Sequence, residues 1–257
     1  MMKKVAIVTG AARGIGAAIS THLVAVGYQV LGVDLDWGQL ANQLSTGTKI
    51  DGILQVPADI STQVGCEKVL TALKSKFSGL DILVNNAAIS PKAPDNSRKN
   101  IFDIESDEWD RVMAINVRSV FLLSKLAFPF LLKRHGNIIN IGSMMGVVGA
   151  GNEDENVFPS SISGAHYCAS KAAVINLTYS LAREFSSKKI RVNCVSPGAV
   201  LGGMGNFSGP TLSRLQGQIP LHELALPEHI ANAVLFLSEQ SHITGHNLHI
   251  NGGWLMR

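Results

Sequence analysis

Cysteine is scarce in this sequence, and the way it occurs argues against two kinds of site. The chain has three cysteines, Cys66, Cys168 and Cys194, and no two of them form a CxxC motif. An odd number of isolated cysteines indicates reduced thiols in a cytoplasmic protein rather than a disulfide framework. The eight histidines include no HExxH motif, and we expect no metal site.

Net charge and long apolar runs are also scarce. The excess of Lys and Arg over Asp and Glu leaves a formal charge of only +3, which is too small for the basic stripe that nucleic-acid binding needs. The longest apolar stretch, 120–132, is interrupted by Lys125 and Pro129 and is too short to span a bilayer. The apolar run near the N-terminus ends at Gly10, which favours a strand over a signal peptide. We therefore expect a cytoplasmic protein with no nucleic-acid partner and no membrane.

Hydrophobic residues are abundant and fall into short runs. The chain has 257 residues, 46% of them hydrophobic, which is enough for one large domain spanning residues 1–257. Runs that are nearly continuous in apolar residues are typical of strands covered on both faces of a parallel sheet, and stretches of helical period separate them here. The alternation predicts an α/β fold, a single Rossmann-type doubly wound parallel sheet of about seven strands with helices on both faces. The expected strands are 5–8, 29–33, 53–56, 82–84, 137–141, 191–195 and 247–250, and the expected helices are 16–26, 62–77, 107–133, 167–185 and 227–238.

Two segments look irregular, and these and a third segment could border a binding site. Segments 90–99 and 149–164 are rich in Pro, Asn, Ser or Gly, and long loops of this kind often line ligand sites. The same composition also suits variable surface insertions. Segments near 149–166 and 201–221 each follow an expected strand at its carboxyl end, so we expect them to cover the substrate.

The first expected strand leads into TGAARGIG, residues 9–16, directly before a helix. Glycines at 10, 14 and 16 allow a tight turn and a close backbone approach to a ligand, and the helix N-terminus favours a phosphate there. A glycine-rich turn alone is often only a tight turn. The strand before it and the helix after it favour a nucleotide site.

Asp34 ends the second expected strand, about 20 residues beyond these glycines. A carboxylate at this position can accept hydrogen bonds from both adenosine ribose hydroxyls and would repel a 2′-phosphate. Capping of the next helix is the alternative role for Asp34 or Asp36. The position favours ribose binding, and hence NAD over NADP.

Tyr167 and Lys171 stand four positions apart in YCASK, so on a helix they share one face. A free phenol has a pKa of about 10, and a neighbouring cation would favour its ionised form. The spacing alone does not establish a catalytic pair.

Seven ordered motifs together resemble the classical short-chain dehydrogenase/reductase family. They are TGAARGIG, ADIS at 58–61, DILVNNAA at 81–88, MAINV at 113–117, NIGSMMG at 140–146, YCASK at 167–171 and SPGAV at 196–200, and they cover nearly the whole chain. The resemblance implies one Rossmann domain, nicotinamide-dependent hydride transfer and a homotetramer or homodimer.

The resemblance also implies a role for each motif residue. Tyr167 would donate or accept the proton, and Lys171 would support the phenolate and hold the nicotinamide ribose. Ser143 would bind the substrate oxygen, and Asn116 would position Lys171 through a water. A capping serine and a turn-forming asparagine are the alternative roles for Ser143 and Asn116. The implied cofactor-binding residues are Gly10, Arg13, Gly14, Ile15, Gly16, Asp34, Asp59, Ile60, Asn86, Ala87, Tyr167, Lys171, Pro197 and Gly198.

Three features depart from the family pattern. Ala88 replaces the glycine of NNAG, and Gly202 stands where a threonine often contacts the cofactor. The segment between Ser143 and Tyr167 is longer than usual, so the pocket wall cannot be copied from a relative.

These observations predict an NAD(H)-dependent oxidoreductase that interconverts a secondary alcohol and a ketone, with a sugar, polyol or hydroxy acid as the favoured substrate. The alternative enzyme is a 3-oxoacyl thioester reductase, which KRHG at 133–136 and ITGHNLHINGG at 243–253 resemble. Arg134 and Lys188 could then face an acidic carrier, although solvated surface charge explains both. A catalytically silent nucleotide sensor is the alternative from another class, because fold alone does not set function. A homotetramer is the expected assembly.

Overall fold

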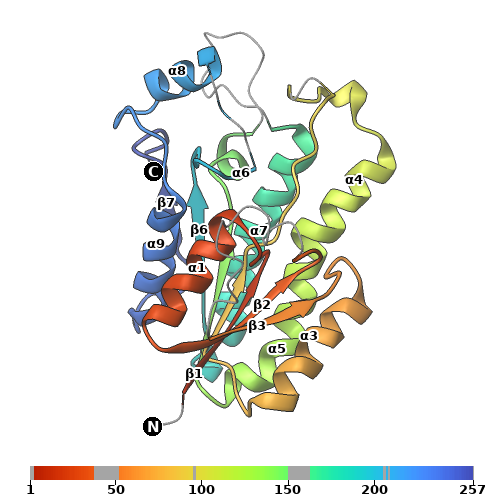
Figure 1. The fold of residues 1–257 in the computed structure, drawn as a ribbon, viewed down its shortest axis with the longest axis vertical. Helices are drawn as coiled ribbons and strands as arrows, with labels where there is room; N and C mark the ends of the chain where they lie inside the picture. Colours follow the sequence, from red (N-terminus) through yellow and green to blue (C-terminus); the bar gives the residue numbers. More distant parts are fainter. Residues whose placement is uncertain are drawn as a thin grey trace.

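The computed structural model describes residues 3–37, 52–94, 97–149, 163–204, 207 and 209–256. Seven parallel strands form one sheet in the order β3-β2-β1-β4-β5-β6-β7 (Figure 1). All seven expected strands are confirmed, most with one or two added end residues. The strands are β1 (Lys4–Thr9), β2 (Tyr28–Asp34), β3 (Ile53–Pro57), β4 (Ile82–Asn85), β5 (Asn137–Ile141), β6 (Arg191–Pro197) and β7 (Asn247–Ile250).

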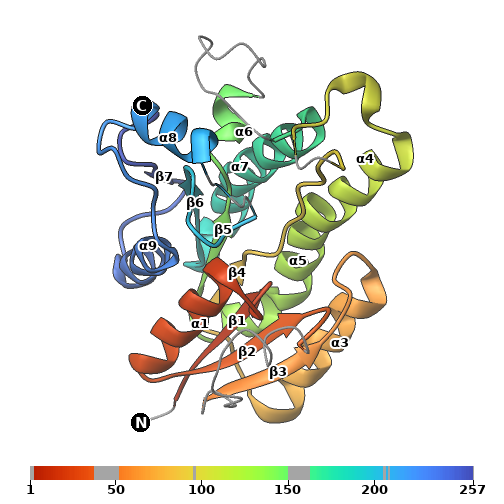
Figure 2. The ribbon, with the colours of Figure 1, turned by 45° about the horizontal axis from the view of Figure 1, so that its top comes forward.

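Helices cover both faces of this sheet, as the apolar runs predicted (Figure 2). Helices α1 and α9 pack together on one face, and α3, α5 and α7 cover the other. The five expected helices are all present. The helices are α1 (Gly14–Ala25), α3 (Gln63–Lys76), α4 (Ser106–Met113), α5 (Ser119–Leu132), α6 (Met145–Val148), α7 (Ala165–Phe185), α8 (Gly209–Gln218) and α9 (Pro227–Glu239), with short 3₁₀ turns η1 (Ile101–Asp103) and η3 (Ser186–Lys188).

The two faces of the sheet have separate hydrophobic cores, because the central strands are buried on both sides. Ile7, Leu83 and Ile138 point into the core under α3 and α5. Their neighbours in the strands, such as Val8 and Ile139, point into the core under α1 and α9. Alternate residues of a strand face opposite sides, so a strand covered on both faces needs apolar residues throughout.

The expected helix 107–133 is one helical stretch broken by a π-helical turn, η2 (Ala114–Arg118). The whole stretch, Ser106–Leu132, is long and apolar enough to cross a membrane by length and composition, with a mean hydropathy of 1.5 in its most apolar window. Here its inner face, including Leu123 and Leu131, is fully buried in the core. A buried core helix meets the same length and composition test, so the stretch carries no argument for a membrane segment.

Segment 201–221, which is expected to cover the substrate, contains α8, a helix that the sequence did not predict. Most of segment 149–164 lies outside the described residues.

The order of the strands fixes where a ligand can bind. The chain crosses from one side of the sheet to the other between β1 and β4, which lie side by side. Open parallel sheets bind ligands beyond the carboxyl ends of the strands at such a switch point. TGAARGIG follows β1 and NNAA spans the end of β4, so both motifs lie at this position.

Candidate active site

The turn after β1 is shaped for a close approach of backbone to ligand. Gly10 and Gly14 have φ of +64° and +52°, the left-handed region that glycine adopts without strain. A Cβ on Gly16 would lie 2.0 Å from the Gly10 carbonyl oxygen, so only glycine fits there. The Asn86 amide donates to the carbonyl oxygens of Thr9 and Gly10, at 2.8 and 3.2 Å, and fixes the turn against β4.

Asp34 lies at the end of β2, beside this turn. One of its carboxylate oxygens accepts from the Ala12 backbone N–H at 2.9 Å, and the other accepts from Leu35 N–H at 2.8 Å. The carboxylate is therefore held in place beside the glycine turn. Arg13, exposed at the start of α1, is the neighbouring cation.

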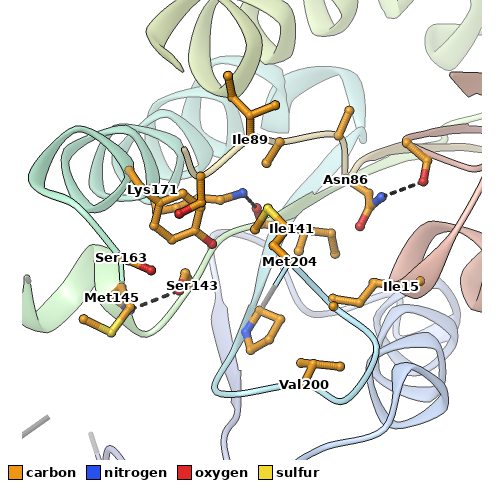
Figure 3. A pocket seen from close by; sticks show the side chains of 18 of the residues that line it. Ile15, Asn86, Ile89, Ile141, Ser143, Met145, Ser163, Lys171, Val200 and Met204 are labelled. Atoms are coloured by element: carbon orange, nitrogen blue, oxygen red, sulfur yellow. Dashed lines mark hydrogen bonds between the residues drawn. The ribbon is translucent and has the colours of Figure 1, made fainter. Parts of the chain in front are cut away.

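A cavity of about 710 Å³ extends from this turn across the carboxyl ends of the strands. It brings together every predicted site residue except Gly16 and Asn116. Figure 3 shows four of them, Ile15, Asn86, Ser143 and Lys171, around the cavity. Gly16 lies behind the turn, and Asn116 is buried behind the cavity wall. The predicted residues that line the cavity are Gly10, Arg13, Gly14, Ile15, Asp34, Asp59, Ile60, Asn86, Ala87, Ser143, Tyr167, Lys171, Pro197 and Gly198.

Tyr167 and Lys171 do share one face of α7, and both side chains are buried. Lys171 Nζ lies 5.8 Å from the centre of the Tyr167 ring and donates to the Ile141 carbonyl oxygen at 2.6 Å. This bond holds the ammonium at the end of β5, on the cavity side (Figure 3).

The pKa of Tyr167 differs from the expectation that a cation would lower it. Burial raises the pKa of Tyr167 to about 12, and a side-chain hydrogen bond with Ser143 offsets only part of this effect. Burial also lowers the pKa of Lys171 to about 8, because it penalises the charged ammonium. Burial is therefore the main influence on the pKa of Tyr167, and the neutral phenol is the favoured form near neutral pH.

Ser143 follows β5 and faces the cavity near Tyr167. Its Oγ accepts at 3.1 Å from the backbone N–H of Met145, the first residue of the short helix α6, whose N-cap is Met144. This bond and the expected substrate contact are compatible, because a hydroxyl can accept one bond and donate another.

Asn116 lies in the π-helical turn η2 and contacts two elements of the site. Its Oδ1 accepts from the Ile89 N–H at 2.8 Å, and its Nδ2 donates to the Ile89 carbonyl oxygen and to Ser170 Oγ, both at 2.9 Å. Ser170 Oγ in turn donates to the Tyr167 carbonyl oxygen at 2.7 Å. Asn116 therefore joins the segment after β4 to α7, and its link to Lys171 stays a prediction.

Sequence reasoning missed the outer half of the cavity. Its apolar walls come from α6, α8 and the C-terminal segment, and two cations, Lys92 and Arg214, also line it. The α8 residues stand in a Gly, Pro and Ser-rich stretch that gave no helical signal. The apolar lining residues here are Met144, Met145, Phe207, Leu215 and Trp254.

Gly202, at the position where relatives often have threonine, also lines the cavity. A Cβ on Gly14 would come within 3.2 Å of the Gly202 carbonyl oxygen. A backbone oxygen therefore approaches the glycine turn where the family has a side chain.

The residues present fit a dinucleotide. Gly10 and Gly16 let the turn pack directly against Asn86 and Ala87, which a Cβ at either position would prevent, and backbone N–H groups at a helix N-terminus suit a phosphate. Asp34 stands where an adenosine ribose is held in such folds. Among the residues that the structure describes, no group of three or more His, Cys, Asp or Glu side chains could hold a metal ion, and this includes His242, His246 and His249.

Comparisons with known proteins agree with this geometry. The family model described as enoyl-(acyl carrier protein) reductase matches residues 10–255. The 3-oxoacyl-[acyl-carrier-protein] reductase FabG of Escherichia coli K12 is 37% identical over 98% of both chains. The 2-(S)-hydroxypropyl-CoM dehydrogenase 3 of Xanthobacter autotrophicus is 34% identical over 98% of this chain and 97% of its own.

A solved structure is similar over the same length. The crystal structure of the 3-ketoacyl-(acyl-carrier-protein) reductase from Brucella melitensis complexed with NADH has a TM-score of 0.82, at 31% identity over 98% of both chains. Fold, motif order and full-length similarity lead to one conclusion: the chain belongs to the classical short-chain dehydrogenase/reductase family, as a nicotinamide-dependent oxidoreductase acting on CH–OH groups.

Proposed function

We propose that this enzyme reduces 3-oxoacyl thioesters to 3-hydroxyacyl thioesters. The observation that carries the proposal is the apolar outer half of the cavity, walled by Met145, Leu215 and Trp254. A sugar or polyol site needs several polar groups that match the substrate hydroxyls, whereas apolar walls accept an acyl chain. Among the described residues that line the cavity, the only acidic ones are Asp34 and Asp59, and both lie at the cofactor end.

The names of the relatives support a thioester as the substrate more than the sugar, polyol or hydroxy acid that the sequence favoured. Four of the similar curated proteins from different bacteria carry the name 3-oxoacyl-[acyl-carrier-protein] reductase. The thioester reductase that the sequence left as an alternative thus becomes the leading substrate assignment. A catalytically silent sensor has no need for Ser143, Tyr167 and Lys171 in one cavity, so we do not favour it.

The side chains of the site suit reduction. Ser143 would donate a hydrogen bond to the ketone oxygen, and Tyr167 would donate the proton that converts this oxygen to a hydroxyl. A bound nicotinamide supplies the hydride. Burial raises the pKa of Tyr167 to about 12, which keeps the phenol protonated near neutral pH and ready to donate. Lys171, fixed by the Ile141 carbonyl, would hold the nicotinamide ribose.

We infer that the cofactor is NADH rather than NADPH. Asp34 lines the cavity at the ribose position, and its two oxygens are already oriented by backbone N–H groups. A 2′-phosphate there would face a fixed negative charge. Arg13 is the counterbalancing cation, but it is exposed and free to move toward solvent.

We also infer one domain and a homo-oligomer, with a tetramer favoured. Apolar residues of α5 and α7 that face the core, such as Val120, Leu123 and Ile175, are buried within the chain. Phe121 and Tyr179 remain exposed and could pack against a second copy. The described residues form a single sheet with its helices, which supports a single domain over residues 1–257.

The test is a reduced-nicotinamide absorbance assay with thioesters of 3-oxo acids of four to ten carbons, with polyols and sugars as oxidation substrates. We expect kcat/KM for at least one thioester to exceed that of every sugar and polyol by about 100-fold or more. Ser143→Ala should lose most of this activity. Faster turnover of a sugar or polyol would overturn the thioester assignment and return the enzyme to the substrate class that the sequence favoured.

A further inference from the structure

A buried polar cluster lies directly beside Tyr167 and has no role in the chemistry above. His166, the residue before Tyr167, is fully buried, and its Nε2 lies 3.1 Å from Glu108 Oε1. The other oxygen of Glu108, Oε2, accepts from Lys99 Nζ at 2.6 Å. None of the three residues lines the cavity.

Glu108 is the centre of this cluster and is ionised. Burial alone would raise its pKa, but hydrogen bonds and charge from Lys99 and His166 outweigh burial and lower it. A carboxylate only accepts hydrogen bonds, so His166 Nε2 must carry the proton. Both pairs are largely shielded from solvent, with 22% of the Glu108 side chain exposed, which makes them stronger than surface ion pairs.

The histidine is not there for packing. Its other nitrogen, Nδ1, is buried and has no hydrogen-bond partner among the described residues. A buried polar atom without a partner costs free energy, and a leucine of similar size would avoid that cost. What the histidine adds is the single directed bond from Nε2 to Glu108.

Glu108 lies on α4, and its two bonds, one to His166 and one to Lys99, join two segments that shape the active site. His166 lies in the first turn of α7, whose N-cap residue, Gly164, provides no side-chain cap. Lys99 lies near the end of the segment between β4 and η1, and Ile89 and Lys92 of the same segment line the cavity. Gly164 is packed tightly between them, since a Cβ there would lie 2.7 Å from the His166 ring and 3.4 Å from the Lys99 carbonyl oxygen.

We propose that His166 and Glu108 are positioning residues, which fix the first turn of α7 against the segment after β4 and so hold Tyr167 at its place in the cavity. The proposal rests on the proposed role of Tyr167 as proton donor. Neither residue touches the reacting atoms. Asn116 bonds to Ser170 in the following turn of α7, and Glu108, on α4, bonds to His166 at the start of α7.

The test compares His166→Leu with His166→Gln, because the glutamine amide can reach the Nε2 position and donate to Glu108 while leucine cannot. We expect His166→Leu to lower kcat by about 10- to 100-fold, since a displacement of about 1 Å at a reacting group can cost up to 100-fold. KM for the nicotinamide should change less than about twofold. His166→Gln should keep kcat within about threefold of the wild type. His22→Leu on α1, whose ring Nδ1 lies 2.9 Å from the nearby Ala18 carbonyl oxygen, is the matched control and should change neither value.

A second measurement needs no substrate. Hydrogen exchange should become at least about tenfold faster at the first-turn amides of α7, including the Cys168 N–H that bonds to the Gly164 carbonyl, in His166→Leu but not in His166→Gln. Exchange in α1 should stay unchanged in both variants. If the enzyme turned over no thioester, this arm would still decide whether the bridge orders α7.

Two results would overturn the proposal. One is normal kcat and normal exchange in His166→Leu. The other is an equal loss in the Leu and Gln variants, which would mean that ring shape rather than the bond to Glu108 matters. If His166→Leu does not fold, Glu108→Leu removes the same bond from the other partner, and the same kcat and exchange pattern is expected.

Discussion

The preference for NADH over NADPH depends on one carboxylate, and Asp34→Asn tests it with little change in shape. Asparagine keeps an oxygen that can accept from the Ala12 or Leu35 N–H, so the glycine turn should stay in place. The substitution removes only the negative charge. We expect the wild type to bind NADH more tightly and the variant to lose most of this preference.

The magnitude follows from the position of Asp34. Two unit charges about 5 Å apart interact with about 3 kcal/mol at an effective dielectric of about 20. Asp34 is partly exposed, and salt screens part of this energy. About 1 to 3 kcal/mol remains, which corresponds to a preference of about 10- to 100-fold.

The assay is a fluorescence titration of each reduced nucleotide against the protein, which needs no substrate. We expect Kd for NADPH to exceed that for NADH by about 10- to 100-fold in the wild type and by less than about threefold in Asp34→Asn. Asp36→Asn, a change of the same kind outside the cavity lining, is the control and should keep the wild-type ratio. Equal or tighter binding of NADPH by the wild type would refute the reasoning and point to Arg13 as the dominant charge.

Three further predictions follow from the same structure. Tyr167→Phe should lower kcat by at least about 100-fold while leaving NADH binding within about twofold, and near-normal turnover would remove Tyr167 from the proton transfer. Burial lowers the pKa of Lys171 to about 8. Between about pH 8 and 10.5 this lysine is therefore protonated more in the unfolded chain than in the folded one, so its contribution to the stability of the folded state rises with pH. The free energy of unfolding, measured with denaturant at pH 7 and at pH 9, should therefore change less favourably with pH in Lys171→Met than in the wild type. Equal changes in the two proteins would contradict the lowered pKa of Lys171. Light scattering at micromolar concentration should give a mass near four chains of 27.4 kDa, whereas a monomer would contradict the proposed oligomer.

The sheet could be predicted from the sequence because its strands carry a strong signal. Runs such as 5–8 are apolar throughout, and only strands buried on both faces need this pattern. The glycine turn was also predictable, since Gly10, Gly14 and Gly16 stand at positions where the backbone requires glycine.

The outer half of the cavity could not be predicted in the same way. Helix α8 consists of GPTLSRLQGQ, whose Gly, Pro and Ser residues favour a loop locally, and its position depends on packing of Leu215 against distant residues. The bond between His166 and Glu108 joins positions 58 residues apart in the chain. The raised pKa of Tyr167 could not be predicted for a related reason. The burial of this side chain depends on the whole fold, whereas its spacing to Lys171 indicates only that a cation is near.

The π-helical turn η2 acts as a one-residue insertion that keeps a long helix in phase with the core. The buried positions of this helix advance through Val112, Asn116, Val120, Leu123, Ala127 and Leu131. These positions span 19 residues over five turns, whereas five turns at about 3.6 residues account for about 18. The wider turn takes up the extra residue, and Asn116 lies within it. Deleting one residue between 114 and 118 would therefore leave about 18 residues over the same five turns, which suits a regular helix, so α4 and α5 would keep their buried faces toward the sheet. The deletion would instead remove the wide turn in which Asn116 lies. The extra residue thus serves the placement of Asn116 rather than the packing of the helix.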